Sequence, residues 1–341
     1  MTGPLGSGKT TLVRRLLTHP GMDRAAVIIN EIGEIGIDHD LVKMSTENVA
    51  LLANGCLCCS VRTDLQETLR ELFGDRRAGR VPDFDRVIVE TTGLADPAPI
   101  VQTLVSDTML CAHYRLDGVV TLVDLVNGCL QLEQQDEAEK QVALADLVLL
   151  TKADLATSGQ ASRVEAEVAS INPLAARKRV HFGEIDPADL TGLGLANARV
   201  SEGTARFLRL DISASAAVEP TYLGNAAKAR HDRGLKTLSL RFEKPFTWDA
   251  FSAAMDLLVR MRGPDLLRAK GIVNVDGRPM VVQGVQHVFH PPVELDRWPS
   301  EDHSSRMVFI VRRIELEAIR GLFAAVGAID ARVETGRRTP Q

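Results

Sequence analysis

Three of the five cysteines in this sequence lie within four positions, in the stretch NGCLCCSV. Thiolates are soft ligands that bind Zn²⁺ or Cu(I) in preference to Mg²⁺. Cys56, Cys58 and Cys59 cannot satisfy a tetrahedral ion without a fourth ligand, and an incomplete site suits a carrier that must release its metal. The alternative is a tight turn with buried, inert thiols. The other two cysteines, Cys111 and Cys129, stand in apolar surroundings and are expected in the core.

A second chemical motif opens the chain, where GPLGSGKT at residues 3–10 matches the phosphate-loop pattern G-x-x-x-x-G-K-[ST] in full. Glycines let backbone N–H groups curl around phosphates at the N-terminus of a helix. Lys9 is predicted to neutralise the β- and γ-phosphates, and the Thr10 hydroxyl to ligate Mg²⁺. The predicted nucleotide-binding residues of this loop are Gly3, Gly6, Ser7, Gly8, Lys9, Thr10 and Thr11. The alternative is a glycine-rich turn before a helix, and the helical run TTLVRRLL follows directly.

The segment LLTKAD carries the pattern [NST]-K-x-D after an apolar strand. The Asp154 carboxylate can accept two hydrogen bonds, from N1–H and from the exocyclic amine of guanine, and adenine offers no such pair. The Lys152 stem can cover the base, and Thr151 stands where many GTPases have Asn. A Lys-Asp turn after a strand is common by itself. Together with a phosphate loop, this pattern predicts guanine recognition.

Two acidic segments are candidates for sensing the phosphates. In VIVETTG, Glu90 ends an apolar strand and is predicted to hold Mg²⁺ through water, and Gly93 suits a hinge that senses the γ-phosphate. The alternative for Glu90 is a carboxylate that merely ends the strand. The segment NEIGEIGID at 30–38 is glycine-rich and is expected to form a mobile loop before Mg²⁺. Its carboxylates, Glu31 among them, are either functional or solvated loop charges.

The composition of the 341 residues is that of a globular protein, with 45% apolar and 25% charged residues. A net charge of −5 argues against a nucleic-acid binder. The sequence has no apolar run long enough to span a membrane and no signal segment, so the expected compartment is the cytoplasm. An odd, clustered set of cysteines indicates metal binding or reactivity rather than a disulfide framework.

These motifs require a sheet with strand ends at one edge. The first half of the chain alternates apolar runs with helical patterns, which predicts an α/β fold: a parallel P-loop sheet with helices on both faces. The expected strands are 25–30, 49–54, 86–91, 118–124 and 146–152. The expected helices are 9–18, 62–73, 97–106, 132–143 and 159–171.

One element is missing from this pattern. A phosphate loop normally follows the central strand of its sheet, and here only Met1 and Thr2 precede Gly3. The sequence therefore predicts that the first strand is missing or truncated and that translation begins upstream of Met1. If the chain is complete as written, the loop is expected to hang from an unsupported terminus and to bind weakly.

The pattern changes in the second half of the chain. Residues 1–212 are expected to form the P-loop domain, 213–235 a linker of small and polar residues, and 236–330 a smaller α+β domain. In that domain the order β-α-β-β-β-α is predicted, with Thr247 as the N-cap of its first helix and Asp276-Gly277 as a hairpin turn.

Five segments, taken in order, resemble the CobW-type metallochaperone GTPases: GPLGSGKTTL, NEIGEIGID, NGCLCCSVRTDL, VIVETTGLADP and TKAD. The GCLCC element is the specific one, because general GTPases lack it. The second domain is also similar to the CobW C-terminal domain, from LKTLSLRFEKPFTWDAF through GRPMVVQGVQHVF. Many family members carry a His-rich stretch near the domain junction, and this sequence has only the pair His231-Asp232 there.

The resemblance implies GTP hydrolysis with Mg²⁺, coupled to delivery of a transition metal to a client protein. Zinc is the expected metal, with cobalt as an alternative, and the candidates for the fourth ligand are Glu31, Glu34, water or a client side chain. The client is expected to dock on the C-terminal domain, and a homodimer is a further expectation. The alternatives are a cobalt- or iron-handling chaperone for cobalamin synthesis or nitrile hydratase assembly, a P-loop small-molecule kinase, and a non-enzymatic metal-binding protein.

Overall fold

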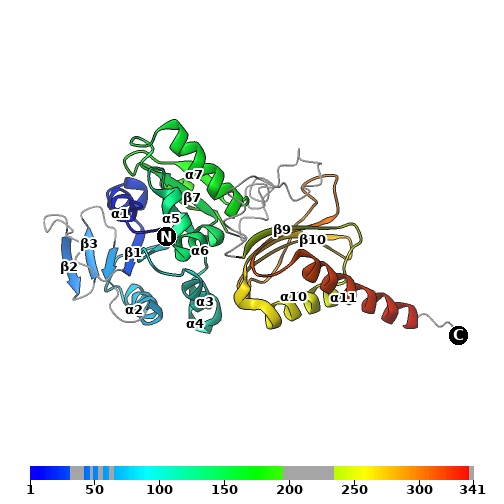
Figure 1. Ribbon diagram of the computed structural model, residues 1–341. Coiled ribbons are helices and arrows are strands. Elements are labelled where there is room, and N and C mark those ends of the chain that lie inside the picture. The colour runs from blue at the N-terminus through cyan, green and yellow to red at the C-terminus, as the bar shows by residue number, and fades with distance from the viewer. Residues whose placement is uncertain (31–41, 47–48, 53–56, 61–64, 195–233, 338–341) are drawn as a thin grey trace. The chain divides into compact units, whose positions relative to one another are not determined.

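The computed structural model (Figure 1) describes the backbone of residues 1–30, 42–46, 49–52, 57–60, 65–194 and 234–337. The chain divides into two compact units: Met1–Ala169 with Ala175–Leu193, and Ser170–Leu174 with Gly194–Gln341. Nearly all of the segment predicted as a linker lies outside the described residues. In the part that is described, no helix is both long and apolar enough to cross a membrane.

The described strands of the first unit form two sheets, in the orders β2-β3-β4-β1-β5 and β6-β7-β8. Their bounds are β1 Ala25–Asn30, β2 Val42–Thr46, β3 Val49–Leu52, β4 Leu57–Ser60, β5 Arg86–Thr91, β6 Val120–Asp124, β7 Leu147–Thr151 and β8 Ala176–Arg179. β1 pairs in parallel with β4 and β5, and β7 pairs in parallel with β6 and β8. The predicted parallel sheet is therefore present. β3 differs from it, because it runs antiparallel to both β2 and β4.

Met1 and Thr2 occupy the position between β5 and β6. The N–H of Thr91 donates to the carbonyl of Met1 at 3.0 Å, and Thr2 forms a parallel bridge with Thr121. The N–H of Thr2 donates to the carbonyl of Val120 at 2.8 Å, and the N–H of Leu122 donates to the carbonyl of Thr2 at 2.9 Å. These two residues stand where the first strand was expected to be missing. They support the phosphate loop from both sides, so it does not hang free.

Helices cover both faces of the sheet that contains β1 in the first unit. Their bounds are α1 Lys9–Leu17, α2 Leu65–Arg77, α3 Ala98–Ser106, α4 Thr108–His113, α5 Gly128–Gln134, α6 Asp136–Leu144 and α7 Ser158–Ile171. Side chains alternate along β1, as a strand buried on both faces requires. Val27 and Ile29 pack with Leu12 and Leu16 of α1. Ala26 and Ile28 instead lie in the cluster formed by α2 and α4 on the other face.

The second unit has a mainly antiparallel sheet, ordered β12-β11-β10-β14-β9, with β13 paired to β11. The elements are β9 Leu235–Phe242, α10 Trp248–Arg262, β10 Leu266–Val275, β11 Arg278–Val285, β12 Val288–Phe289, β13 Val293–Glu294, β14 Ser305–Arg312 and α11 Leu316–Arg337. α10 and α11 pack on one face of this sheet, around Phe251 and Phe323 (Figure 1). The Thr247 side chain accepts the N–H of Ala250 at 3.2 Å, which is the predicted N-cap.

Candidate functional site

The phosphate loop lies at the carboxyl edge of the sheet, where parallel α/β proteins bind their ligands. Gly3 lies so close to β6 that a Cβ there would overlap the carbonyl oxygen of Leu122. Gly8 has a left-handed φ of 94° as the N-cap of α1. Gly3 requires glycine both for space and for its positive φ of 145°, and Gly8 requires it for backbone conformation.

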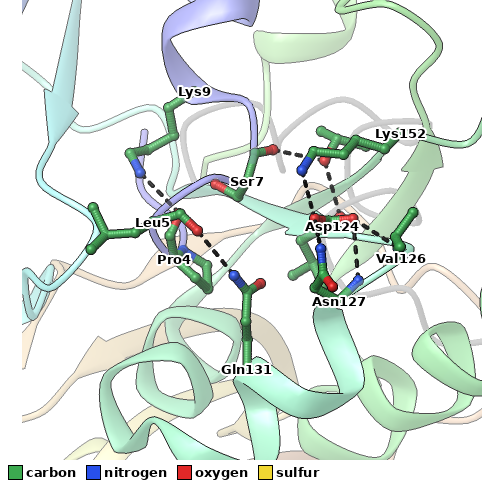
Figure 2. Close-up of polar contacts among 11 residues, drawn as sticks. Pro4, Leu5, Ser7, Lys9, Asp124, Val126, Asn127, Gln131 and Lys152 are labelled. Carbon is green, nitrogen blue, oxygen red and sulfur yellow. Dashed lines mark hydrogen bonds and ion pairs between the residues drawn. The ribbon is translucent and has the colours of Figure 1, made fainter. Parts of the chain in front are cut away.

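The Lys9 side chain forms hydrogen bonds with the backbone of its own loop. It is 5% exposed, and Nζ donates to the carbonyl oxygens of Gly3 at 2.8 Å and Pro4 at 3.1 Å (Figure 2). Thr10 is half-buried and Thr11 exposed in the first turn of α1. A loop of this form, with a buried ammonium and the start of a helix, fits the phosphates of a nucleotide.

Thr151 joins the TKAD segment to the phosphate loop. Its hydroxyl lies 2.7 Å from the carbonyl oxygen of Ser7, to which it donates, and the side chain is 6% exposed. Asp154 is exposed at the same edge, where a base could reach its carboxylate. The structure thus brings the predicted phosphate and base motifs together, 144 residues apart in the chain.

Lys152 is held by Asp124, a residue outside the motifs predicted from the sequence. Its Nζ lies 2.7 Å from a carboxylate oxygen of Asp124, which ends β6 and is 1% exposed (Figure 2). Asp124 also accepts the N–H of Val126 at 2.7 Å and the Nδ2 of Asn127 at 3.0 Å. Burial by itself would raise the pKa of Asp124, but the hydrogen bonds from Lys152, Asn127 and the Val126 amide outweigh it and lower the pKa.

The segment after β5 rests directly on the phosphate loop. A Cβ on Gly93 would lie 2.6 Å from the backbone nitrogen of Leu5, so the two backbones touch. From α6, the Nε2 of Gln141 donates to the carbonyl oxygens of Gly93 at 3.2 Å and Ala95 at 2.9 Å. From α5, the Nε2 of Gln131 donates to the carbonyl oxygen of Leu5 at 2.9 Å (Figure 2). One glutamine therefore holds the segment after β5, and the other holds the phosphate loop.

Glu90 is fully buried at the end of β5. Its carboxylate and the Lys9 ammonium both act on the α-amino group of Met1, which donates to the carbonyl of Val89 at 2.6 Å. Burial lowers the pKa of that amino group to about 6. Glu90 therefore lies among the charges of the phosphate loop, as its predicted role requires, although its interaction with Mg²⁺ stays a prediction.

The structure describes only part of the predicted thiol cluster. Cys58 and Cys59 lie on β4, which pairs with β1. Cys56, Glu31 and Glu34 lie outside the described residues. Among the side chains that the structure describes, no group of three or more His, Cys, Asp or Glu residues could hold a metal ion. The composition of the metal site stays a prediction.

The expectation that Cys111 and Cys129 lie in the core was wrong for Cys111. Cys111 is exposed on α4, with its Sγ 3.3 Å from the carbonyl oxygen of Leu104, and Cys129 is partly buried on α5. α4 is a short surface helix, and its buried side is taken by Leu110, which is 0% exposed. Apolar neighbours in sequence did not decide which way the thiol faces.

Three residues that contact the candidate site were not predicted from the sequence: Asp124, Gln131 and Gln141. A signal existed for Asp124, because it ends an apolar strand just as Glu90 does. The two glutamines gave no signal, since they lie in helices and act on loops that are distant in sequence.

Comparisons with known proteins agree with this geometry. The CobW/HypB/UreG nucleotide-binding domain matches residues 1–178, and the cobalamin synthesis protein CobW C-terminal domain matches residues 235–326. The zinc chaperone YjiA of Escherichia coli is 36% identical over 329 residues, which cover 96% of this chain and 97% of YjiA. The zinc chaperone CobW of Pseudomonas aeruginosa is 32% identical over a region that covers 94% of this chain and 88% of that CobW.

The crystal structure of Zn(II)-bound YjiA GTPase from E. coli has a TM-score of 0.74 at 33% identity, covering 95% of this chain and 96% of that one. A Zn(II)-bound YjiA variant in which one glutamate and two cysteines are replaced by alanine gives a TM-score of 0.75. With both domains matched in order and YjiA similar over nearly its whole length, the chain belongs to the CobW family, with a CobW/HypB/UreG nucleotide-binding domain followed by a CobW C-terminal domain.

Proposed function

We propose that this protein is a GTP-hydrolysing metallochaperone that carries a transition metal at its thiol cluster and delivers it to a client protein. The observation that carries the proposal is the strand order β4-β1-β5. β4 bears Cys58 and Cys59, and β5 carries Glu90 next to its last residue. The segment after β5 contacts the phosphate loop at Gly93. A single strand therefore separates the metal segment from the segment that would sense the γ-phosphate.

The proposed nucleotide site follows from the described contacts. The phosphate loop with Lys9 and Thr10 would hold the phosphates and Mg²⁺, and Asp154 would select guanine. Glu90 and Gly93 would respond to the γ-phosphate. The turnover expected without a client is slow. GTP is favoured over ATP because the Asp154 carboxylate can accept two hydrogen bonds from guanine. The Thr151 hydrogen bond to Ser7 holds the TKAD segment beside the phosphate loop.

Zinc is the proposed metal, because relatives are named as zinc chaperones and a zinc-bound YjiA structure exists. The proposed ligands are Cys56, Cys58 and Cys59, with Glu31 as a candidate for the fourth. The zinc in the YjiA variant is held without the three replaced side chains, so bound zinc alone does not identify a cargo site. The dependence of the affinity on the nucleotide is the property that identifies it.

The remaining parts of the proposal concern the second domain and the cellular setting. The proposed domains are 1–212 for the GTPase and 236–330 for the CobW-like domain, joined by 213–235. A client metalloprotein would dock on the second domain, in the cytoplasm, and the protein would pair with a second copy.

The experiment is a measurement of zinc affinity by competition with a chromogenic chelator, on protein without nucleotide, with GDP and with a GTP analogue. We expect at least a tenfold difference between the nucleotide states, which corresponds to about 1.4 kcal/mol of coupling. Cys58→Ala should lower the affinity in every state and remove the difference. Cys111→Ala is the matched control, because that thiol is exposed on α4. It should change neither the zinc affinity nor its dependence on the nucleotide.

Equal zinc affinity in all three nucleotide states would contradict the chaperone proposal, even if both ligands bind. Turnover of ATP in preference to GTP, dependent on a small molecule, would point to a kinase instead.

A further inference from the structure

Asp124 is a buried charge outside every nucleotide-binding motif of the sequence. It lies at the carboxyl end of β6, 1% exposed, on the edge that carries the phosphate loop. A buried carboxylate is costly unless it is paired and hydrogen-bonded. Asp124 has both kinds of partner, since Lys152 supplies the opposite charge while Val126 and Asn127 supply hydrogen bonds.

The partners of Asp124 fix the direction in which it holds Lys152. One carboxylate oxygen accepts the Val126 N–H, and the other accepts both the Asn127 Nδ2 at 3.0 Å and the Lys152 Nζ at 2.7 Å (Figure 2). The carboxylate therefore cannot rotate without breaking contacts with the turn after β6. The ammonium is tied to one point of a rigid strand end.

The backbone of Lys152 is constrained as well. Its φ is 57°, a left-handed value that is uncommon for a residue other than glycine. The carbonyl of Lys152 accepts the N–H of Leu155 at 3.0 Å and of Ala156 at 3.2 Å, so the turn that carries Asp154 closes on it. The backbone and the ammonium are both held, so the four methylenes must span two fixed points, which limits the paths open to them.

We propose that Asp124 is a positioning residue for the purine base of the bound nucleotide, acting through Lys152. It holds the lysine ammonium so that the methylene stem forms one wall of the base site beside Asp154. The inference rests on the proposed function, because it needs a guanine nucleotide at this edge.

The proposal separates the roles of the two aspartates. Asp154 would read the hydrogen-bonding edge of guanine and so decides which base binds. Asp124 would act on the wall, which contacts any purine, and so contributes to affinity without selectivity. GTP and GDP carry the same base, so a change at Asp124 should alter the affinity for both by the same factor and leave kcat at saturating GTP unchanged.

The test is a double-mutant cycle with Asp124→Asn and Lys152→Met, read as the dissociation constant of a fluorescent GDP analogue on the full chain. We expect Asp124→Asn to weaken GDP and GTP about tenfold each, and Lys152→Met to weaken them by a similar factor. In the Lys152→Met background, Asp124→Asn should have no further effect on the affinity, because its route to the base is already lost.

Asp146→Asn is the matched control. Asp146 is also buried, at 5% exposure, and its carboxylate accepts the Val119 N–H at 3.0 Å, but it lies at the amino end of β7, away from the loop. Its replacement should lower the melting temperature without changing the nucleotide affinity of the folded protein.

Three results would overturn the inference. Equal GDP affinity of the wild type and Asp124→Asn would do so, and so would additive losses in the double mutant. A loss in Asp146→Asn as large as in Asp124→Asn would show that the effect is general destabilisation. A wild-type chain with no affinity for GDP or GTP would remove the proposed function itself, together with this inference.

Discussion

Thr151 shows how a single hydroxyl can join two motifs. Its side chain is 6% exposed and donates to the Ser7 carbonyl at 2.7 Å, and it also lies 3.3 Å from the carbonyl of Val123. The sequence predicted Thr151 as a nucleotide-binding residue of the TKAD motif, at the position where many GTPases have Asn. In the structure, the side chain ties the end of β7 to the loop that precedes α1.

Replacing Thr151 with Val keeps the shape of the side chain and removes the donor. The Ser7 carbonyl then loses a buried partner, which costs about 1–3 kcal/mol. We expect the affinity for GDP to fall about tenfold, the equivalent of about 1.4 kcal/mol. Titration calorimetry measures this directly. Thr151→Ser retains the hydroxyl and should bind within about twofold of the wild type; a loss there as large as in the valine variant would refute the explanation.

At the scale of elements, the contact between the β5 loop and the phosphate loop depends on Gly93. A methyl group there would lie 2.6 Å from the Leu5 backbone nitrogen, so Gly93→Ala has to push two backbones apart. We expect the free energy of unfolding to fall by about 1–3 kcal/mol, as for overpacking in a core. Nucleotide affinity should fall with it.

The control for Gly93→Ala lies in α2. A Cβ on Gly74 would meet nothing within 4 Å, and helix propensity favours alanine by up to about 1 kcal/mol. Gly74→Ala should therefore stabilise the protein in urea unfolding. If both substitutions destabilised it equally, the close approach at Gly93 would not be the cause.

The elements that the sequence predicted well are those with a strong apolar signal. The predicted 25–30 and 86–91 coincide with β1 and β5. β8 was missed because three of its four residues, ARKR, are charged and exposed at the sheet edge. The predicted helix 132–143 is in fact α5 and α6, broken at Gln135, which has extended backbone angles and no glycine or proline to announce the break.

The candidate site was predictable where one local motif suffices. The phosphate loop and TKAD were both found, and the structure brings them together. The pairing of Asp124 with Lys152 was not predictable, because 28 residues separate the partners and only the register of β6 and β7 makes them neighbours. The same is true of Gln131 and Gln141.

At the scale of the whole molecule, each unit has its own core and should unfold in its own transition. GDP at about 100 times its dissociation constant should stabilise only the first unit, by about 2.7 kcal/mol. Phe323→Ala should lower only the transition of the second, by about 3–5 kcal/mol, because Phe323 is 1% exposed among Phe242, Phe246, Phe251 and Phe309. Differential scanning calorimetry can resolve the unfolding transitions of the two units. A single transition that moves in both experiments would contradict this independence.

The position of Met1 and Thr2 between β5 and β6 decides where a purification tag or fusion partner can be attached. Residues placed ahead of Met1 start from the interior of the sheet, beside the carbonyl of Val89 and two residues from Gly3. Apolar β-formers there could pair with β5 and β6, whereas a charged tag would bring its charges next to the core. A tag joined after α11 is free of this constraint, and it leaves the conformation of the phosphate loop unchanged.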